Sequence, residues 1–298
     1  MTVLAFIGLG IMGGPMAANL VKAGYDVIGY DTNHSALASL QNLGGRSAGS
    51  IAQAVTDADV VITMLPDSPD VQAVALGEEG IYANARAGTL HIDCSSIRPD
   101  IAQQLARRAT DLGLRAVDAP VSGGEVGAIE ALLSIMVGGQ PDDVSEAQQI
   151  LQHVGSTIVH VGPHGAGQTV KAANQLIVAG TIQLVAEAIV FLEAYGVDTT
   201  AAVKVLAGGL AGNAILDRKV TSMLQRDFTP GFRIDLHHKD MGILTSAARD
   251  AGVIIPLGSH VAQLIASLRA SGHGQLDHTA LLLLVERLSG RDLQSAKV

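Results

Sequence analysis

Short apolar runs alternate with amphipathic segments over the first half of the chain, which is the pattern of helices wound around a parallel sheet. Strands are expected at residues 3–7, 26–30, 60–64, 90–93, 116–118, 134–137 and 157–161. Helices are expected between them, at residues 13–22, 35–43, 99–112 and 142–154. Each helix is followed by a glycine, a residue that takes the left-handed C-terminal cap at little cost: Gly24, Gly44, Gly113 and Gly155. The first half is therefore expected to be an α/β domain with a doubly wound, mainly parallel sheet.

The pattern changes after Gly162-Pro163-His164-Gly165, where the β-rich runs end. The rest of the chain is typical of helices with short breaks at residues 208–209, 229–231 and 272–274. We therefore expect a domain boundary near residue 163, with a sheet domain at residues 1–163 and an all-α domain at residues 164–298. A long helix at residues 167–195 would join them. Its apolar stretch contains Gln183, Glu187 and Glu193, which favour a buried helix over a membrane-spanning one.

Composition limits the kind of protein this can be. A length of 298 residues suits two domains, and 48% hydrophobic residues are too many for a disordered chain. The formal charge of −9 argues against binding to nucleic acid or to an anionic membrane. Cys94 is the one cysteine, which excludes an intrachain disulfide and suits a reducing compartment, so we expect a cytoplasmic protein. The ten histidines are scattered, and no metal site is expected.

A glycine-rich loop follows the first expected strand. It has the form G-x-G-x-x-G and consists of Gly8, Leu9, Gly10, Ile11, Met12 and Gly13. The loop opens a helix, and Asp31 follows 18 residues after Gly13, at the end of the next expected strand. The first glycine permits the tight turn, the second lets a pyrophosphate approach the backbone, and the third lets helix and strand pack closely. The helix N-terminus then supplies amide donors. This spacing predicts a Rossmann dinucleotide-binding domain.

Asp31 bears on which dinucleotide binds. A carboxylate at this position can accept both ribose hydroxyls and would repel a 2′-phosphate. NADH is therefore favoured over NADPH, although Asn33 and His34 leave NADPH open.

Lys171 is a candidate proton donor, because lysine is scarce and this one opens an apolar, small-residue helix. Asn174 follows at the i+3 position, so both side chains can project to one side. A lysine beside a dinucleotide and a carbonyl substrate can protonate the developing alkoxide, and Asn174 could orient the substrate or the amine. The alternative is a lysine that extends from a domain-junction helix to solvent.

Two further segments are less specific. The loop Asp118-Ala119-Pro120-Val121-Ser122-Gly123-Gly124 follows an expected strand, at the sheet edge where ligands bind. Its successive amides could receive a carboxylate, or it could be a plain tight turn. Lys239 precedes Asp240, and its spacing alone favours a solvated helix start over a ligand contact.

Taken together, these motifs resemble the β-hydroxyacid dehydrogenase family. The resemblance rests on residues 6–20, 118–124, 165–175 and 239–240, in family order, and covers essentially the whole chain. It implies that Lys171 is the catalytic general acid and base, that Asn174 assists it, and that the substrate carboxylate is held by Ser122, Gly123 and Gly124. It also implies dimers or tetramers, and cofactor contacts by the loop from Gly8 to Gly13, by Leu65, Pro66, Ser96 and Lys239.

Within the family, residues 208–213 and 231–237 look most like the tartronate semialdehyde (2-hydroxy-3-oxopropionate) reductases, in which Phe232 would help to wall the substrate pocket. The implied reaction is the reversible reduction of a small carboxylate substrate, tartronate semialdehyde, to D-glycerate, in which NADH is oxidised to NAD⁺. The alternatives are 3-hydroxyisobutyrate dehydrogenase, another short semialdehyde or β-hydroxyacid dehydrogenase, and a non-enzymatic NAD-binding sensor. Two segments depart from the usual family pattern, the serine at position 96 and residues 241–244.

Overall fold

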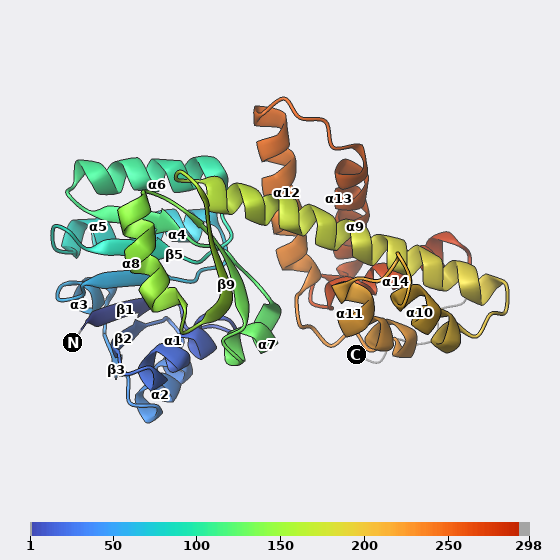
Figure 1. Ribbon diagram of the computed structural model, residues 1–298, viewed down its shortest axis with the longest axis horizontal. Coiled ribbons are helices and arrows are strands. Elements are labelled where there is room, and N and C mark those ends of the chain that lie inside the picture. The colour runs from blue at the N-terminus through green and yellow to red at the C-terminus, as the bar shows by residue number, and fades with distance from the viewer. Residues whose placement is uncertain (1, 292–298) are drawn as a thin grey trace. The chain divides into compact units, whose positions relative to one another are not determined.

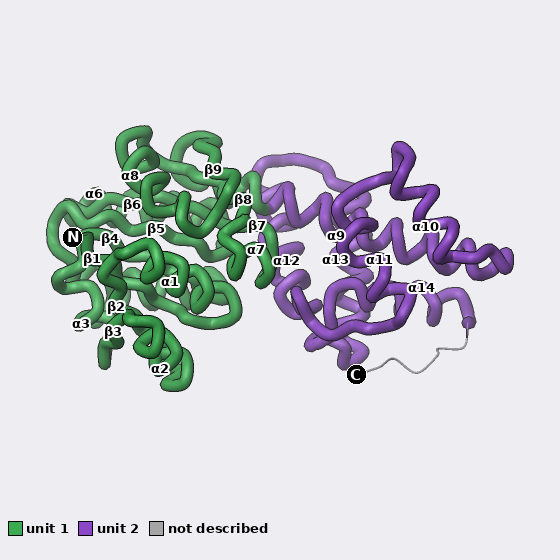
Figure 2. Tube along the Cα trace, turned by 60° about the horizontal axis from the view of Figure 1, so that its bottom comes forward, with its two compact units in different colours: residues 1–171 green, residues 172–298 purple. Residues whose placement is uncertain are grey.

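The computed structural model describes residues 2–291, and the chain divides into two compact units (Figure 2). Residues 1–171 form the sheet unit and residues 172–298 the helical unit. The division falls later than the boundary expected near residue 163. The first turns of helix α9 (Ala166–Ala194) belong to the sheet unit, because their backbone amides bond to Asp118 of the sheet.

The sheet unit contains the expected Rossmann sheet. Its described strands are β1 (Val3–Ile7), β2 (Asp26–Tyr30), β3 (Arg46–Ser47), β4 (Val60–Thr63), β5 (Leu90–Asp93), β6 (Arg115–Asp118), β7 (Val121–Ser122), β8 (Leu133–Gly138) and β9 (Gly155–Gly162). Their order is β3-β2-β1-β4-β5-β6-β8-β7, with β9 paired to β8. The neighbouring strands β3, β2, β1, β4, β5 and β6 pair in parallel, which is the doubly wound order. Strand β8 pairs antiparallel to both β6 and β7. The seven expected strands are present; β3 and β7, of two residues each, have no pattern that could predict them.

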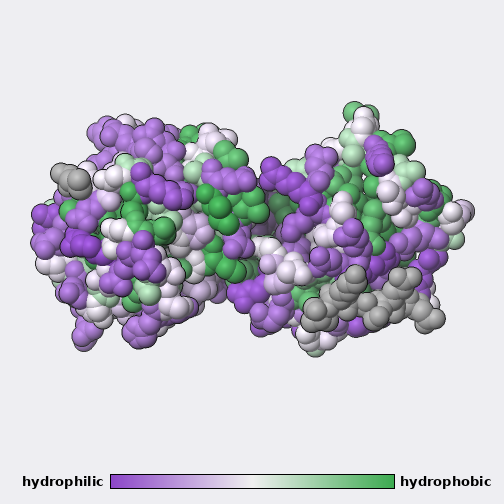
Figure 3. Space-filling view, turned by 90° about the horizontal axis from the view of Figure 1, so that it is seen from below, coloured by the Kyte–Doolittle hydropathy of each residue, from purple (hydrophilic) through white to green (hydrophobic). Residues whose placement is uncertain are grey.

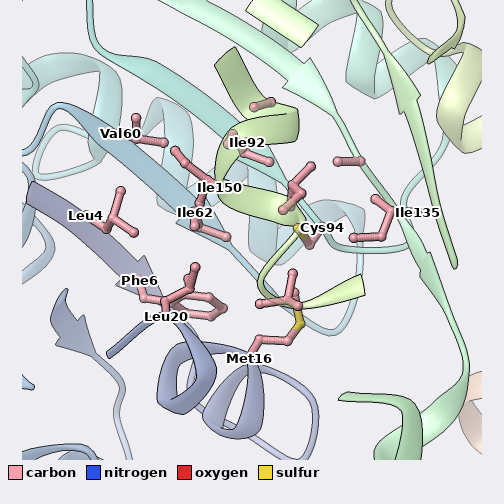
Figure 4. Close-up of a cluster of buried hydrophobic side chains, with 14 of the residues drawn as sticks. Leu4, Phe6, Met16, Leu20, Val60, Ile62, Ile92, Cys94, Ile135 and Ile150 are labelled. Carbon is pink, nitrogen blue, oxygen red and sulfur yellow. The ribbon is translucent and has the colours of Figure 1, made fainter. Parts of the chain in front are cut away.

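Helices cover both faces of this sheet (Figure 1). They are α1 (Gly13–Lys22), α2 (His34–Asn42), α3 (Ile51–Val55), α4 (Ser68–Leu76), α5 (Ile81–Asn84), α6 (Pro99–Asp111), α7 (Gly124–Ile129) and α8 (Pro141–Leu151). Strand β1 is apolar at successive positions because both of its faces are buried. Leu4 and Phe6 pack with Met16 of α1 in one core cluster (Figure 4), whereas Ala5 and Ile7 belong to the cluster on the other face.

The expected glycine caps hold in three of four cases. Gly24, Gly44 and Gly113 have φ of +91°, +97° and +72°, as a left-handed cap requires. The prediction for Gly155 is wrong, because its φ is not positive and it opens strand β9. A Cβ there would lie 2.5 Å from the carbonyl oxygen of Leu133, so close strand packing is what requires this glycine.

The described part of the helical unit is all-α, as expected. After α9 it contains α10 (Thr199–Ala207), α11 (Ala214–Gln225), α12 (Ile234–Asp250), α13 (Pro256–Leu268) and α14 (Leu281–Leu288), with short turns at Arg269–His273 and His278–Ala280. Among residues 2–291, α9 is the one helix long and apolar enough to cross a membrane, a test that core helices also pass. Ala179, Ile182 and Ala186 of α9 are fully buried, so this helix contributes one side to the core of the helical unit.

Candidate active site

The glycine loop after β1 has the geometry of a dinucleotide cradle. Gly8 has φ of +94°, and a Cβ there would overlap the carbonyl oxygen of Met64, because the loops after β1 and β4 meet. A Cβ at Gly13 would overlap the carbonyl oxygen of Gly8. At Gly10 a Cβ would meet nothing within 4 Å, so this part of the backbone faces open space. The two outer glycines close the turn, and the middle one leaves room for a ligand.

Asp31 is tied to this loop. The backbone amide of Leu9 donates to Asp31 Oδ2 at 2.6 Å, and that of Asn33 donates to Oδ1 at 2.7 Å. Each carboxylate oxygen has a second lone pair, and Asp31 is only partly buried. The same side chain can therefore hold the loop in place and accept hydroxyl groups from a ligand.

The outer part of the loop borders a groove of about 420 Å³ within the sheet unit. Loop residues and residues of α1, α2 and α7 line it, among them Leu9, Gly10, Ile11, Ala36 and Ile129. Ile11 is 60% exposed, and Met12 is partly buried. The loop thus presents both backbone and apolar side chains to a ligand.

The loops after β4 and β5 meet at the carboxyl edge of the sheet. The amide of Leu65 donates to Ser95 Oγ at 2.9 Å, which joins the two loops. Leu65 and Ser96 are partly buried, and Pro66 is exposed. Three residues expected to contact a cofactor therefore lie in two loops that this hydrogen bond joins.

Ser122 ends β7, and the next two residues turn the chain into α7. Gly123 has φ of +144° and Gly124 has φ of +66°, backbone conformations that favour glycine. A Cβ at Gly124 would meet nothing within 4 Å, so this turn is open on one side. Two successive glycines with positive φ thus turn the chain from β7 into α7.

Lys171 lies in the second turn of α9 and is buried, with 8% of its surface exposed. The start of this helix is anchored to the sheet by Asp118, whose carboxylate accepts the amides of Gly165 and Gln168. Gln168 is 1% exposed, and its side chain bonds to the backbone of residues 95 and 97. Sequence reasoning assigned no role to Gln168; the signal available was a long amide in an otherwise small-residue helix start.

A buried polar cluster lies behind this anchor. Thr63 Oγ1 donates to Asp93 Oδ1 at 2.7 Å, so it accepts from His91 Nε2, which leaves His91 Nδ1 to accept from the hydroxyl of Tyr82. Burial raises the pKa of Asp93 to about 6 and lowers that of His91 to about 4. Burial also raises the pKa of Asp118, against the effect of its backbone donors. Asp93 Oδ2 has no hydrogen-bond partner among residues 2–291.

In the helical unit, Asn174 and Lys239 belong to one chain of contacts. Asn174 Nδ2 donates to Gln175 Oε1 at 2.7 Å, and Gln175 Nε2 donates to Asp240 Oδ2 at 2.6 Å. Lys239 Nζ lies 2.9 Å from Asp240 Oδ1. Two expected site residues are thus brought together through Gln175 and Asp240, for which the sequence suggested no role.

Phe232 precedes α12, and its backbone amide bonds to a buried carboxylate. Its amide donates to Asp277 Oδ2 at 3.0 Å, and its ring packs on His237 and His278, with centroids 5.6 and 5.4 Å away. Burial alone would raise the pKa of Asp277, but His278, Lys219 and its hydrogen-bond donors lower it to about 2. The backbone that carries Phe232 is therefore held by an ionised side chain.

Comparison with known proteins identifies relatives of both units. Residues 3–162 match the family model described as the NAD binding domain of 6-phosphogluconate dehydrogenase, and residues 165–285 match NAD-binding of NADP-dependent 3-hydroxyisobutyrate dehydrogenase. The chain is 39% identical to 2-hydroxy-3-oxopropionate reductase of Escherichia coli (strain K12) over 291 residues, which cover 97% of this chain and 99% of that one. The chain belongs to the β-hydroxyacid dehydrogenase family. It is therefore an oxidoreductase with NAD-binding domains.

Other family members differ in the substrate that their names give. NAD-dependent L-serine dehydrogenase of Pseudomonas aeruginosa is 35% identical over 295 residues, covering 97% of this chain and 99% of its own. The structure of Mycobacterium tuberculosis 3-hydroxyisobutyrate dehydrogenase with L-serine is 37% identical and superposes with a TM-score of 0.87, covering 96% of this chain and 99% of that one. Since three differently named relatives have similar identity, family membership leaves the substrate open.

Proposed function

We propose that this family member reduces tartronate semialdehyde reversibly to D-glycerate, with NADH as the preferred cofactor and Lys171 as general acid and base. The observation that carries the proposal is the setting of Lys171: a buried lysine one helical turn after Gln168, whose side chain bonds to the loop that contains Ser96. The relative named 2-hydroxy-3-oxopropionate reductase, which matches nearly the whole chain, supports this choice of substrate.

The residues divide the work of binding and proton transfer. The open backbone at Gly10 and the carboxylate of Asp31 fit a dinucleotide with a free ribose 2′-hydroxyl, and Leu65, Pro66, Ser96 and Lys239 contribute further contacts. When bound, the nicotinamide supplies or accepts the hydride. The amides of the turn at Ser122, Gly123 and Gly124 hold the substrate carboxylate.

Lys171 then donates a proton to the substrate oxygen during reduction and takes one back during oxidation. Asn174 orients the substrate, and Phe232 excludes water on the side that it covers. Because Lys171 is buried, its proton is delivered to a position that solvent reaches poorly.

A second candidate is the oxidation of another short β-hydroxyacid, such as 3-hydroxyisobutyrate or L-serine, which the names of two relatives favour. A rate panel separates the candidates: tartronate, methylmalonate and succinate semialdehydes and glyoxylate with NADH and NADPH, and L-serine with NAD⁺. We expect the highest kcat/KM for tartronate semialdehyde with NADH. A higher value for another compound would replace the substrate, and a preference for NADPH would contradict the role of Asp31.

Substitution of Lys171 tests the chemistry itself. Lys171→Ala should bind NADH nearly normally and lose turnover by about 100- to 10,000-fold, the range of general acid–base catalysis. Lys204→Ala, which removes a lysine from the exposed side of α10, is the matched control and should keep its turnover. Turnover near that of the wild type in Lys171→Ala would exclude Lys171 as proton donor. NADH binding without turnover of any panel substrate by the wild type would favour a sensor instead.

We propose further that the chain works as a cytoplasmic dimer or tetramer. Ile177, Leu184 and Phe191 of α9 are 68%, 65% and 61% exposed and lie seven residues apart, on one side of the helix. Hydrophobic residues reach the surface of the helical unit between polar ones (Figure 3), as expected where a second copy covers them. Leu184→Glu should therefore shift the molar mass measured by light scattering towards that of a monomer; an unchanged mass would exclude this surface.

A further inference from the structure

We propose that Asp118 and Gln168 are positioning residues for catalysis, which lock the start of α9 onto the loops after β5 and β6 and thereby hold Lys171 in place as proton donor. The inference rests on the function proposed above, since it assumes that Lys171 acts on the substrate. Lys171 follows Gln168 by three positions, so a slide or rotation of the first turns of α9 moves both side chains together. A proton donor must be placed within a fraction of an ångström, and this start of the helix is where its position is set.

Asp118 makes the first set of hydrogen bonds that hold the start of α9. Its Oδ1 accepts the amide of Gly165 at 2.7 Å, and its Oδ2 accepts that of Gln168 at 3.0 Å. Amides at a helix start have no partner within the helix, and here a strand residue far earlier in the chain satisfies two of them. Gly138 and Gly167 make room for the carboxylate, because a Cβ at either would lie 2.6 or 2.8 Å from one of its oxygens. The site is thus built around this one side chain.

Gln168 makes the second set of hydrogen bonds that hold the start of α9. Its Oε1 accepts the amide of Ile97 at 3.0 Å, and its Nε2 donates to the carbonyl oxygen of Ser95 at 2.8 Å. Ser95 Oγ in turn accepts the amide of Leu65, so the same contact reaches the loop after β4. One buried amide therefore ties the helix of the proton donor to the two loops expected to contact the cofactor.

A positioning role differs from a merely structural one in its dependence on Lys171. If Gln168 acts through Lys171, its removal can lower turnover only while Lys171 is present. If it supports the fold in general, the losses caused by the two substitutions multiply. A double-substitution experiment separates these cases.

The experiment uses Gln168→Met, which fills a similar volume without the two hydrogen bonds. We expect kcat to fall about 10- to 100-fold, as for a proton donor displaced by about 1 Å, while the Kd for NADH stays within about twofold of the wild type. Thr169→Ala is the matched control: it removes the bond from Thr169 Oγ1 to the carbonyl oxygen of Gly165 in the same turn, and should leave kcat within about twofold. In single-turnover measurements on Lys171→Ala, adding Gln168→Met should cause no further loss.

Two results would overturn the proposal: an unchanged kcat in Gln168→Met, or an equal loss in the presence and absence of Lys171. Both leave the proposed function intact, provided that Lys171→Ala loses turnover. If Lys171→Ala keeps its turnover, the proposed function fails and this inference fails with it. Should Gln168→Met not fold, Asp118→Asn takes its place with the same expected and contrary results, because its amide nitrogen cannot accept from a backbone N–H.

Discussion

Asp118 in the sheet unit and Asp277 in the helical unit each hold a distant backbone segment by hydrogen bonds, but folding shifts their pKa values in opposite directions. Both are nearly fully buried, and both accept two or more backbone amides from a distant segment. The pKa of Asp118 is raised, mainly by burial, whereas that of Asp277 falls to about 2. The difference is in their neighbours: His278 and Lys219, the latter 3.0 Å away, lower the pKa of Asp277, while the strand neighbour of Asp118 is another carboxyl group, Asp93.

The comparison shows that backbone amides alone do not offset the burial of a carboxylate. His278 and Lys219 beside Asp277 favour its ionised form, and this carboxylate holds the loop that carries Phe232. At Asp118, burial outweighs the lowering effects of its backbone donors and of His164, and Asp118 in turn raises the pKa of Asp93.

Removing the Asp277 carboxylate should have the largest effect. Asp277→Ala leaves Lys219 without its buried partner and the amides of Gly231 and Phe232 without an acceptor, so we expect a loss of about 3 to 5 kcal/mol in the free energy of unfolding. Urea denaturation at pH 7 measures it. Asp217→Ala, at an exposed position of α11, is the control and should change this free energy by less than about 0.5 kcal/mol. An equal loss of unfolding free energy in the two variants would show that Asp277 stabilises the fold no more than an exposed aspartate does.

Neutralising Asp93 should stabilise the protein, and only above acidic pH. Because folding raises the pKa of Asp93 from 3.8 to about 6, the folded state holds this proton more tightly, and the contribution of Asp93 to stability falls as pH rises from 3.8 to 6. Asp93→Asn should therefore gain up to about 3 kcal/mol over the wild type at pH 7 and little at pH 4.

His91 works in the opposite direction. Its pKa is lowered to about 4 on folding, so its contribution to stability grows as pH rises from 4 to 6.5. In Asp93→Asn the opposing effect of Asp93 is absent, so the stability of this variant should increase as pH rises from 4 to 6.5. Denaturation curves at several pH values measure it, with Asp111→Asn at an exposed position as control. A variant less stable than the wild type by the same amount at every pH would show that Asp93 is needed for its hydrogen bonds alone.

Removing one cation from Asp277 should have the smallest effect. In Lys219→Met the carboxylate keeps its backbone donors and His278, so we expect a loss of about 1 to 2 kcal/mol at pH 7. The pKa of Asp277 should rise, and because its stabilising contribution is lost as pH falls through that pKa, acid unfolding should begin at higher pH. Circular dichroism during acid titration measures the midpoint. An unchanged midpoint would show that His278 and the amides suffice.

Much of the fold could be predicted because its signals are local. The G-x-G-x-x-G loop, its flanking strand and helix, and Asp31 lie within one βαβ unit, so spacing alone identified them. The two-residue strands β3 and β7 and the true reason for Gly155 could not be predicted, since each depends on which strand lies alongside.

The sequence by itself determined the order of elements and the change from an α/β to an all-α unit, since these follow from periodicity and motif spacing. The family followed from the resemblance of its motifs to those of known members. Only the tertiary structure decided how the site's side chains are held. Asp118 and Gln168 belong to recognisable motifs, but their bonds join residues 47 to 73 positions apart. Asp277 and Lys219 stand in no motif at all, and 58 positions separate them. Whether a buried carboxylate is ionised depends on which charges surround it in space, and no local pattern of residues encodes that.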